Sequence, residues 1–360
     1  MHDDILPLLE AWDGEGVVVR YDQPTGTWIF VALHSSRLGR PTGGTRVRVY
    51  SGLRDAMRDA MRLAEGMTYK WAGLGLGYGG GKTVMALSRP LDADEKRGLM
   101  HRYGELLEGL GGAFATGADL GTDSRDIAHM AERTQYVVGV DREAGGATDP
   151  GPFTARGVLA GIRSAVAHHR GDPDATGLAD VRVLIQGLGG VGGPLARLLD
   201  ADGAELLLTD RDTARAEALA GALDRASVVA TGRTLSEPCD VYAPCAIGGV
   251  LHQETIPELR CHIVAGSANN QLAEEDDAER LARRGILYVP DYIINAGGAL
   301  AFSMIADGLD DLDEIHRRVD AIGVAVAEIL AEASSSGATP LAAARTRVDR
   351  MFSELAAAAS

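Results

Sequence analysis

The segment Gly187-Leu188-Gly189-Gly190-Val191-Gly192 decides the fold of this chain. It follows the apolar residues 181–185 and precedes residues 195–199, whose apolar side chains have helical spacing. A GxGxxG sequence between a strand and a helix is the fingerprint of a dinucleotide-binding unit. Its first glycine permits a tight turn, its second lets the backbone approach a pyrophosphate, and its third lets the helix pack closely on the strand. The predicted cofactor contacts in this loop are Gly187, Gly189, Gly190, Val191 and Gly192.

Apolar segments at regular spacing continue beyond the glycine-rich loop. We expect strands at residues 181–185, 205–209, 227–229, 241–243, 262–264 and 286–289. Helical segments separate several of them, and this alternation predicts a parallel, doubly wound sheet. Two helices should follow. One carries an apolar stripe over residues 315–329, and the other is expected to start with Thr339 as its N-cap and Pro340 at its first position.

An acidic residue stands where the dinucleotide fingerprint requires one. Asp210 closes the second of these strands, about 20 residues beyond the glycines, where a carboxylate binds the adenosine ribose hydroxyls. The same carboxylate would repel the 2′-phosphate of NADP. We therefore expect NAD as the cofactor. Arg211 follows directly, so NADP stays open as an alternative.

The first third of the chain mixes strands and helices around a glycine-rich centre. Strands are expected within residues 16–50, on either side of a turn at residues 23–26, and a helix over residues 53–65. A second helix is expected over residues 94–110. Residues 140–153 are rich in glycine, proline and aspartate, and we place a domain boundary there.

The composition excludes several classes of protein. The net charge of −16 disfavours nucleic acids and anionic membranes as partners. No apolar run approaches the roughly 18 residues that span a bilayer, and the first residues do not resemble a signal peptide, so we expect a cytoplasmic protein. The three cysteines are expected to be reduced packing residues. No HExxH, paired CxxC or carboxylate–histidine cluster is evident, so no metal site is expected.

Two lysines lie close together in the glycine-rich part. Lys70 follows Gly66-Met67-Thr68-Tyr69, and Lys82 follows three glycines. A P-loop would need glycine where Leu76 stands, so that interpretation is excluded. Two neighbouring lysines would disfavour each other's charge, and one could then act as a base while the other binds a carboxylate. Two ordinary surface lysines remain the alternative.

Three further polar positions are candidates for chemistry. Asp119 precedes a helical segment, where an aspartate is also a common N-cap. Asn269 and Asn270 follow one predicted strand, and Asn295 follows the last one. Ligands of open α/β sheets bind beyond the carboxyl ends of the strands, although asparagines are also common in turns.

Together these segments resemble the glutamate/leucine/phenylalanine/valine dehydrogenase family. The matching stretches are Gly43-Gly44-Thr45-Arg46, Gly66-Met67-Thr68-Tyr69-Lys70, Gly79-Gly80-Gly81-Lys82, Asp119, residues 187–192, Ala243-Pro244-Cys245-Ala246, Gly266-Ser267-Ala268-Asn269-Asn270 and Asn295-Ala296-Gly297-Gly298. They keep their order over about residues 15–345. The resemblance implies NAD-dependent, reversible oxidative deamination of an L-amino acid to a 2-oxo acid and ammonia.

The resemblance also implies a role for each matched residue. Lys82 would be the general acid/base that activates water, and Asp119 would relay a proton to and from the substrate amine. Lys70 would bind the substrate carboxylate. The other implied substrate contacts are Thr42, Gly43, Gly44, Met67, Gly117, Asn270 and Ala299. The remaining implied cofactor contacts are Thr154, Ala246, Ile247, Asn269 and Asn295, of which Thr154 and Asn295 would hold the nicotinamide carboxamide.

The expected fold is α/β with two domains and an active-site cleft between them. Residues 1–145 would form a substrate-binding and oligomerisation domain, joined by C-terminal helices at about 330–360. Residues 146–329 would form the Rossmann domain. By the same resemblance, the protein would be a homo-oligomer.

Small residues at three positions bear on the choice of amino acid. Leucine dehydrogenases would carry alanine and glutamate where this chain has Gly117 and Ala118, and valine where it has Ala299. A larger pocket would favour an aromatic substrate such as phenylalanine, with a branched aliphatic substrate as the alternative. Thr42 adds a hydroxyl that either turns away or faces an unusual substrate.

Two other classes of protein compete with this interpretation. A 2-hydroxy acid dehydrogenase should offer a histidine–carboxylate pair near the matched segments, and none is evident. A non-catalytic NAD-binding protein on the same scaffold predicts loss of Lys82 or Asp119, and both are present.

Overall fold

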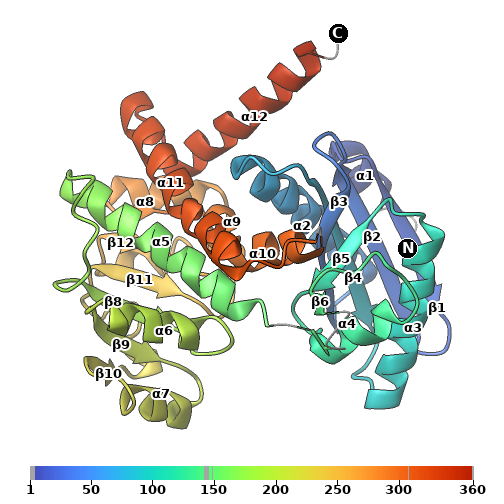
Figure 1. Cartoon of the computed structure of the whole chain (residues 1–360), viewed down its shortest axis with the longest axis horizontal. Helices are drawn as coiled ribbons and strands as arrows, with labels where there is room; N and C mark the ends of the chain where they lie inside the picture. The colour runs from blue at the N-terminus through green and yellow to red at the C-terminus, as the bar shows by residue number, and fades with distance from the viewer. Residues whose placement is uncertain (1–4, 142–145, 148, 307, 359–360) are drawn as a thin grey trace. The chain divides into compact units, whose positions relative to one another are not determined.

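Two units, each with its own sheet, make up the chain (Figure 1). The computed structural model describes residues 5–141, 146–147, 149–306 and 308–358. One unit comprises Met1–Asp149 and Phe302–Gly308, and the other Pro150–Ala301 and Leu309–Ser360.

The first unit contains a five-stranded mixed sheet in the order β1-β2-β4-β3-β5. Its strands are β1 (Gly16–Asp22), β2 (Thr27–Ser35), β3 (Pro41–Val49), β4 (Gly79–Leu87) and β5 (Ala115–Ala118). β1 and β2 form a hairpin across the expected turn, and β3 runs parallel to both β4 and β5. Its other elements are α1 (Leu6–Ala11), α2 (Leu53–Gly73), α3 (Ala93–Gly109), α4 (Ser124–Ala131), β6 (Val140–Asp141) and β7 (Gly146–Ala147).

Alternation along the strands assigns each face of this sheet to different helices. Phe30 and Ala32 of β2 belong to one apolar cluster with α2. Ile29 and Val31, one residue out of phase, belong to another cluster with α3 and α4. Because side chains alternate along a strand, even-numbered positions of β4 from Lys82 to Ala86 share the α2 face. This alternation determines which helix covers the candidate catalytic lysine.

Helix α2 is longer than its sequence pattern predicted. We expected it over residues 53–65, but it continues through Gly66 to Gly73. Glycine in a helix interior costs about 1 kcal/mol relative to alanine. Burial of Met67 and Trp71 on the sheet offsets that cost, because a fully buried apolar side chain contributes about 1.5–3 kcal/mol.

The second unit contains a six-stranded sheet in which every pairing is parallel. Its order is β10-β9-β8-β11-β12-β13, so the chain reverses its direction of progress between β8 and β11. The strands are β8 (Arg182–Gln186), β9 (Glu205–Thr209), β10 (Ala226–Val228), β11 (Val241–Pro244), β12 (Ile263–Val264) and β13 (Leu287–Tyr288). This order is that of the dinucleotide-binding fold, which confirms the predicted doubly wound sheet.

The remaining helices belong to the second unit, except that α10 passes into the first unit at Phe302. They are α5 (Gly151–Arg170), α6 (Gly192–Ala201), α7 (Thr213–Ala220), α8 (Asp276–Arg283), α9 (Asp291–Ile294), α10 (Gly297–Ala306), α11 (Leu312–Ser336) and α12 (Pro340–Ala358), with short 3₁₀ turns η1 (Thr231–Arg233) and η2 (Ile256–Glu258). In the described part of the chain no single helix is long and apolar enough to cross a membrane. Only α11 and residues 340–355 taken together, across a bend of 103°, meet that criterion of length and composition.

The final helices differ from the expected domain arrangement. We expected residues 330–360 to join the first domain, but contacts group α11 and α12 with the second unit. The physical reason is that α12 packs against α11 and β13, and that Arg345 of α12 pairs with Glu275 of the second unit, while the apolar stripe of α11 packs against α5. The Ser164 hydroxyl of α5 also donates to the Gly323 carbonyl at 2.8 Å. Thr339 caps α12 as predicted, since its Oγ1 accepts from the Ala342 N–H.

Candidate functional site

Lys82 is a buried charge on the α2 face of the first sheet. Its side chain is only 7% exposed, and its Nζ lies 2.7 Å from Oδ2 of Asp119. The glycines before it bring α2 close to the strand: a Cβ at Gly80 would lie 1.9 Å from Oγ1 of Thr68. The bare backbone therefore serves close packing of helix on strand, and the first long side chain after it is Lys82.

Asp119 lies directly after β5 and does not cap a helix. Asp123 is the N-cap of α4. The Asp119 backbone N–H instead donates to Oγ1 of Thr122 at 2.8 Å. A Cβ at Gly44 would come within 2.8 Å of the Asp119 Cβ. Gly44 thus leaves the space in which the Asp119 carboxylate approaches Lys82.

A second cation contacts the same carboxylate. Arg46 Nε lies 3.3 Å from Asp119 Oδ2, and Arg46 Nη1 lies 2.9 Å from Asp59 Oδ2. Tyr50 Oη donates to Asp59 at 2.7 Å. Asp59 therefore holds Arg46 from the α2 side while Arg46 faces Asp119.

The charges around Asp119 fix its protonation state. Burial by itself would raise the pKa of this carboxyl, but the positive charges of Lys82 and Arg46 outweigh burial and hold the pKa well below its usual range. Asp59 behaves in the same way: burial opposes ionisation, while Tyr50 and Arg46 lower the pKa. The cluster thus contains two ionised carboxylates, each facing at least one cation.

Arg46 and Asp59 were not predicted as site residues. Arg46 lies in the matched stretch Gly43-Gly44-Thr45-Arg46, which was the available signal. Asp59 is 13 positions away on a helix and gives no local signal. Their pairing depends on how β3 packs against α2, which a linear pattern does not contain.

The remaining substrate candidates of the first unit lie on β3, α2 and β5. Met67 and Lys70 are both buried residues of α2. A Cβ at Gly43 would lie 3.2 Å from Cγ of Met67, so these two positions adjoin. The Thr42 hydroxyl donates to the Arg40 carbonyl at 3.0 Å. At Gly117 a Cβ would lie 2.9 Å from Cγ2 of Val138.

The space at Gly117 is therefore not open. We expected the missing side chain to enlarge the substrate pocket, but Val138 takes up that volume. The Val138 N–H donates to the Thr116 carbonyl at 2.7 Å, which fixes Val138 beside β5. The Thr42 side chain, near the start of β3, is also bound locally, because its hydroxyl donates to the Arg40 carbonyl.

In the second unit, the glycine-rich loop has the two kinds of glycine that the fingerprint requires. Gly187 has a φ of +93°, and a Cβ there would lie 2.6 Å from that of Ala246. A Cβ at Gly192 would lie 1.9 Å from the Gly187 carbonyl oxygen. By contrast, a Cβ at Gly189 or Gly190 would meet no atom within 4 Å. Gly187 and Gly192 therefore allow close packing within the protein, whereas Gly189 and Gly190 leave an exposed backbone without side chains.

That exposed backbone precedes a helix N-terminus. α6 starts at Gly192 after Val191, and no side chain caps it. Uncapped N–H groups and the helix dipole favour an anion at this position. The loop therefore fits the pyrophosphate of a dinucleotide.

Asp210 lies beside the same loop. Its Oδ2 accepts from the Leu188 N–H at 2.7 Å and its Oδ1 from the Asp212 N–H at 2.9 Å. Burial would raise the pKa of this carboxyl, but these backbone bonds lower it below the usual value. Asp210 is thus an ionised acceptor with lone pairs left for hydroxyl groups. The neighbouring Arg211 is exposed.

The other cofactor candidates form hydrogen-bonded pairs in the second unit. Asn295 Nδ2 donates to Asn269 Oδ1 at 2.8 Å and to the Ser267 carbonyl at 3.2 Å. The Thr154 hydroxyl donates to Pro150 and accepts from the Gly298 N–H at 3.1 Å. These bonds orient the side chains after β12 and at the start of α5 and α10.

Four more candidates in this unit are placed by its loops. Ala246 touches the Gly187 turn, and Ile247 is 70% exposed. Asn270 has a φ of +53°, a left-handed conformation that asparagine tolerates better than most residues. Ala299 is half-buried near the start of α10.

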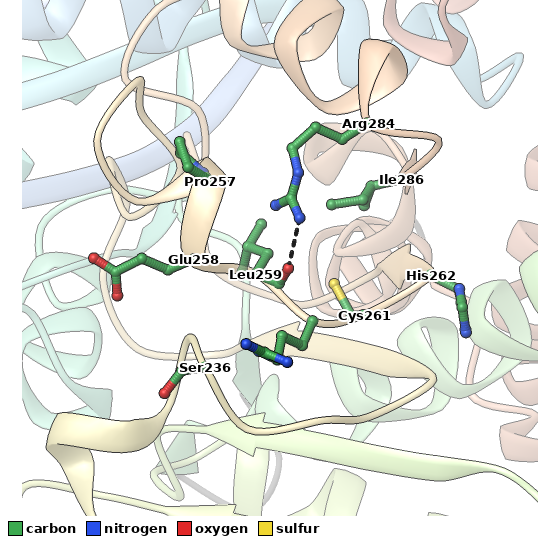
Figure 2. A pocket seen from close by; sticks show the side chains of 9 residues that line it. Ser236, Pro257, Glu258, Leu259, Cys261, His262, Arg284 and Ile286 are labelled. Carbon is green, nitrogen blue, oxygen red and sulfur yellow. Dashed lines mark hydrogen bonds between the residues drawn. The ribbon is translucent and has the colours of Figure 1, made fainter.

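A cavity of about 590 Å³ in this unit contains none of the predicted residues (Figure 2). Arg284 lines it, but its guanidinium donates to the carbonyls of Ile256 and Leu259. Cys261 also lines it, and burial raises the pKa of that thiol to about 12. The three cysteines are free, in agreement with their predicted role as reduced packing residues.

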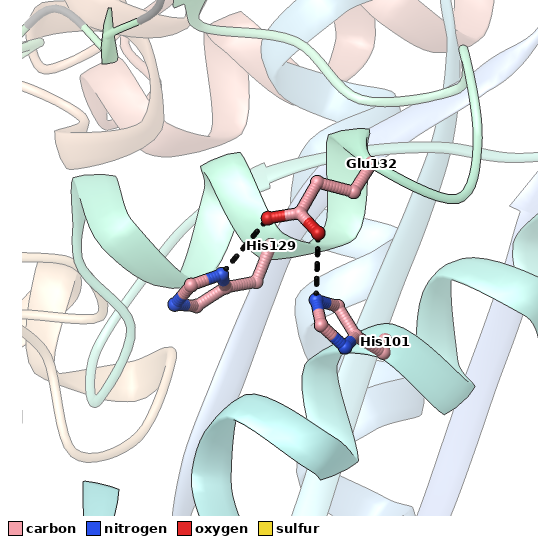
Figure 3. A group of neighbouring side chains, drawn as sticks. All are labelled: His101, His129 and Glu132. Carbon is pink, nitrogen blue, oxygen red and sulfur yellow. Dashed lines mark hydrogen bonds and ion pairs between the residues drawn. The ribbon is translucent and has the colours of Figure 1, made fainter. Parts of the chain in front are cut away.

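One expectation about side-chain clusters is wrong. The sequence showed no carboxylate–histidine cluster, yet His101, His129 and Glu132 come together in the first unit (Figure 3). His101 is on α3, whereas the other two are three positions apart at the end of α4. The pair at i and i+3 was a local signal, but its third member required the packing of α3 on α4.

Comparison with known proteins adds independent findings. Residues 22–136 match the family model described as the Glu/Leu/Phe/Val dehydrogenase dimerisation domain. Residues 205–346 match the model described as Glutamate/Leucine/Phenylalanine/Valine dehydrogenase.

Relatives that align over most of this chain are also amino acid dehydrogenases. A leucine dehydrogenase from Bacillus cereus is 37% identical over 97% of this chain and 94% of the relative. A phenylalanine dehydrogenase from Bacillus thermotolerans is also 37% identical, over 95% of this chain and 89% of the relative. The crystal structure of L-tryptophan dehydrogenase from Nostoc punctiforme superimposes with a TM-score of 0.81 and 33% identity, covering 98% of this chain and 99% of that one.

Proposed function

Because the chain belongs to the Glu/Leu/Phe/Val dehydrogenase family, we propose that it catalyses the NAD-dependent oxidative deamination of an L-amino acid. The enzyme is an oxidoreductase that acts on a CH–NH₂ group. In the balanced reaction the amino acid, NAD⁺ and water give the 2-oxo acid, ammonium, NADH and a proton. The Lys82–Asp119 pair is the observation that carries this proposal, since deamination requires proton transfer at both water and nitrogen.

The cofactor is NAD, which when bound accepts the hydride from the substrate Cα. The open backbone at Gly189 and Gly190 and the α6 N-terminus would hold its pyrophosphate. Asp210 would accept hydrogen bonds from the adenosine ribose and would repel a 2′-phosphate. Thr154 and Asn295 would orient the nicotinamide carboxamide, each through a side chain already fixed by neighbouring bonds.

The first unit would carry the proton chemistry. Lys82 would give up its own proton before water attacks and would then accept one from the attacking water. Asp119, ionised beside it, would exchange a proton with the substrate amine. Arg46 would keep Asp119 oriented and ionised. Lys70 would bind the substrate carboxylate, helped by the backbone at Gly43 and Gly44.

We propose an aromatic L-amino acid as the preferred substrate. Support comes from Ala299, where leucine dehydrogenases are expected to have valine, and from the similarity to a phenylalanine and a tryptophan dehydrogenase. Removing methyl groups from a pocket wall shifts preference by about 1–3 kcal/mol. Gly117 adds nothing to this argument, because Val138 fills its space.

A branched aliphatic amino acid is the second candidate. The leucine dehydrogenase from Bacillus cereus is as similar to this chain as the phenylalanine dehydrogenase, at 37% identity. Val138 beside Gly117 also restores apolar volume that a smaller substrate would contact.

The test is NADH formation, followed by absorbance at alkaline pH with purified protein and a panel of L-amino acids. We expect turnover with NAD, little with NADP, and the highest kcat/KM for phenylalanine, tyrosine or tryptophan. A higher kcat/KM for leucine or valine would overturn the aromatic proposal and keep the chemistry. Folded protein that binds NAD and turns over none of them would overturn the catalytic proposal.

We also propose that the protein is a homo-oligomer. The family model that matches residues 22–136 is described as a dimerisation domain. Light scattering during size-exclusion chromatography should give a mass that is a multiple of 37.7 kDa. A monomeric mass at micromolar concentration would contradict this proposal.

A further inference from the structure

Two imidazoles meet one carboxylate on the surface formed by α3 and α4 (Figure 3). His101 Nε2 lies 3.1 Å from Glu132 Oε2, and His129 Nδ1 lies 3.3 Å from Glu132 Oε1. The two rings meet edge to face, with centroids 5.5 Å apart. One ligand atom from each residue lies within 4.8 Å of the other two.

The geometry differs from that of an ordinary surface ion pair. His101 Nε2 is inaccessible to solvent, yet in the described structure it has no partner with hydrogen-bond geometry. The Glu132 oxygen nearest to it is at ion-pair distance only. This ring nitrogen therefore points into the cluster without a hydrogen bond that satisfies it.

The ligand set determines which ion would fit. Imidazole nitrogen with one carboxylate suits Zn²⁺ and neighbouring transition metals, whereas Mg²⁺ and Ca²⁺ prefer sites made of oxygens. Two histidines and one glutamate leave the fourth position of a tetrahedral Zn²⁺ for water. We propose that His101, His129 and Glu132 bind one Zn²⁺ ion or a similar divalent transition metal, separately from the dehydrogenase reaction.

Such an ion would join two helices that already pack together. Lys96 of α3 contacts Asp126 of α4 at 2.6 Å, so the two helices have a fixed approach near this point. The metal would add a second link at the C-terminal end of α4. Because it binds the folded arrangement and not the separated helices, it should raise the thermal stability of the protein.

The test uses full-length protein freed of metal with EDTA. Isothermal titration with ZnCl₂ should show one ion per chain, and Co²⁺ should give the visible absorption of a tetrahedral complex. Zn²⁺ should raise the melting temperature. The variants His101→Gln and His129→Gln should each weaken Zn²⁺ binding by about 100-fold, since even loss of an outer-shell partner costs about 10- to 100-fold.

His169→Gln is the matched control. His169 stacks on His262 with ring centroids 5.2 Å apart, so the substitution removes an imidazole from a different histidine pair. We expect it to leave Zn²⁺ affinity unchanged, and metal-free turnover should be the same in all three variants. Absence of stoichiometric binding to the wild type, or binding that both His101→Gln and His129→Gln leave intact, would overturn the proposal. Those readouts do not involve the dehydrogenase reaction, so they are distinguishable from failure of the proposed function.

Discussion

The two units present opposite kinds of candidate site. In the first, buried charged side chains from four elements converge: Lys82 of β4, Asp119 after β5, Arg46 of β3 and Asp59 of α2. In the second, the predicted site is mostly exposed backbone around Gly189, with the carboxylate of Asp210 beside it. The first arrangement can move protons, whereas the second can hold a large anionic ligand. This difference predicts that substitutions in the two units lower different quantities. Those in the first unit should lower kcat, and those in the second should lower the affinity for NAD.

The largest effect should follow from Lys82→Ala. General acid–base catalysis is worth about 10²- to 10⁴-fold, so kcat should fall by that amount. NAD affinity, measured by fluorescence quenching, should stay the same because Lys82 and the glycine-rich loop belong to different units. Near-normal turnover would exclude Lys82 as the acid/base. A parallel loss of NAD affinity would contradict the proposal that proton transfer and NAD binding belong to separate units.

Asp119→Asn tests whether the buried cluster depends on ionised Asp119. Removing one partner of a buried ion pair costs about 3–5 kcal/mol, which urea unfolding at pH 7 would measure. The folded-state pKa is lowered, so this stabilisation is present above the ordinary value of about 4 and is lost as the pH falls towards the folded pKa. The difference between wild type and variant should therefore shrink below about pH 4.

Asp94→Asn is the control for that experiment. Asp94 is 87% exposed and pairs with Arg97 in the next turn. Its substitution should change the free energy of unfolding by less than about 0.5 kcal/mol at any pH. An equal effect of both substitutions would mean that burial of Asp119 contributes nothing.

Arg46→Gln should have an intermediate effect. Arg46 pairs with Asp119 at ion-pair distance and donates a hydrogen bond to Asp59. A hydrogen bond to a charged group contributes about 1.5–3 kcal/mol, so kcat should fall by about 10- to 100-fold when the Arg46 contacts are lost. Loss of this cation should also raise the pKa of Asp119 and move the acidic limb of the kcat–pH profile to higher pH. Arg48→Gln removes an exposed arginine two positions along β3 and should do neither. An unshifted profile in Arg46→Gln would leave Arg46 with a structural role only.

In the second unit, Gly189→Ala should weaken NAD binding without harming the fold. A methyl group at this position would have no atom of the described residues within 4 Å, so the melting temperature should not change. It would occupy the space needed for close approach to the pyrophosphate, and loss of one charged hydrogen bond there corresponds to about 10-fold in Kd. Gly192→Ala should instead destabilise the protein, because its Cβ would overlap the Gly187 carbonyl. Unchanged NAD affinity in Gly189→Ala would remove the loop from the cofactor site.

The same contrast explains how much could be predicted from sequence. The residues of the dinucleotide loop are contiguous in the sequence, from Gly187 to Gly192. A sequence pattern can therefore identify all of them. Asp210 followed from the same fingerprint, and the parallel, doubly wound sheet followed from the alternation of strands and helices. The buried charged cluster of the first unit is built by packing, and spacing alone gave Lys82 and Asp119 only as candidates, to which the resemblance to a family then assigned roles. Asp59 had no signal at all, because a single aspartate on an amphipathic helix is ordinary.

The errors have physical causes of the same kind. Gly117 was expected to leave an empty volume, but an absent side chain opens a pocket only where no neighbour fills it, and Val138 does. α2 was expected to end near Gly66, but tertiary burial of Met67 and Trp71 continued it. In both cases the prediction used a local sequence pattern, but contacts between segments distant in the sequence determined the structure.

Thr42→Val should have the smallest effect and settles a question specific to the first unit. If the hydroxyl faced the substrate, replacing it would change the ratio of kcat/KM for tyrosine and phenylalanine by at least about 10-fold, as expected where a buried polar contact is lost. The structure instead shows this hydroxyl donating to the Arg40 carbonyl. Thr42→Val should then cost about 1–3 kcal/mol of stability, because it leaves that carbonyl unsatisfied, and should change the tyrosine/phenylalanine ratio by less than about 2-fold. A large change in the ratio would mean that the Thr42 hydroxyl turns towards the substrate when it binds. The first unit would then recognise polar groups on the substrate side chain in addition to the charged groups of the amino acid.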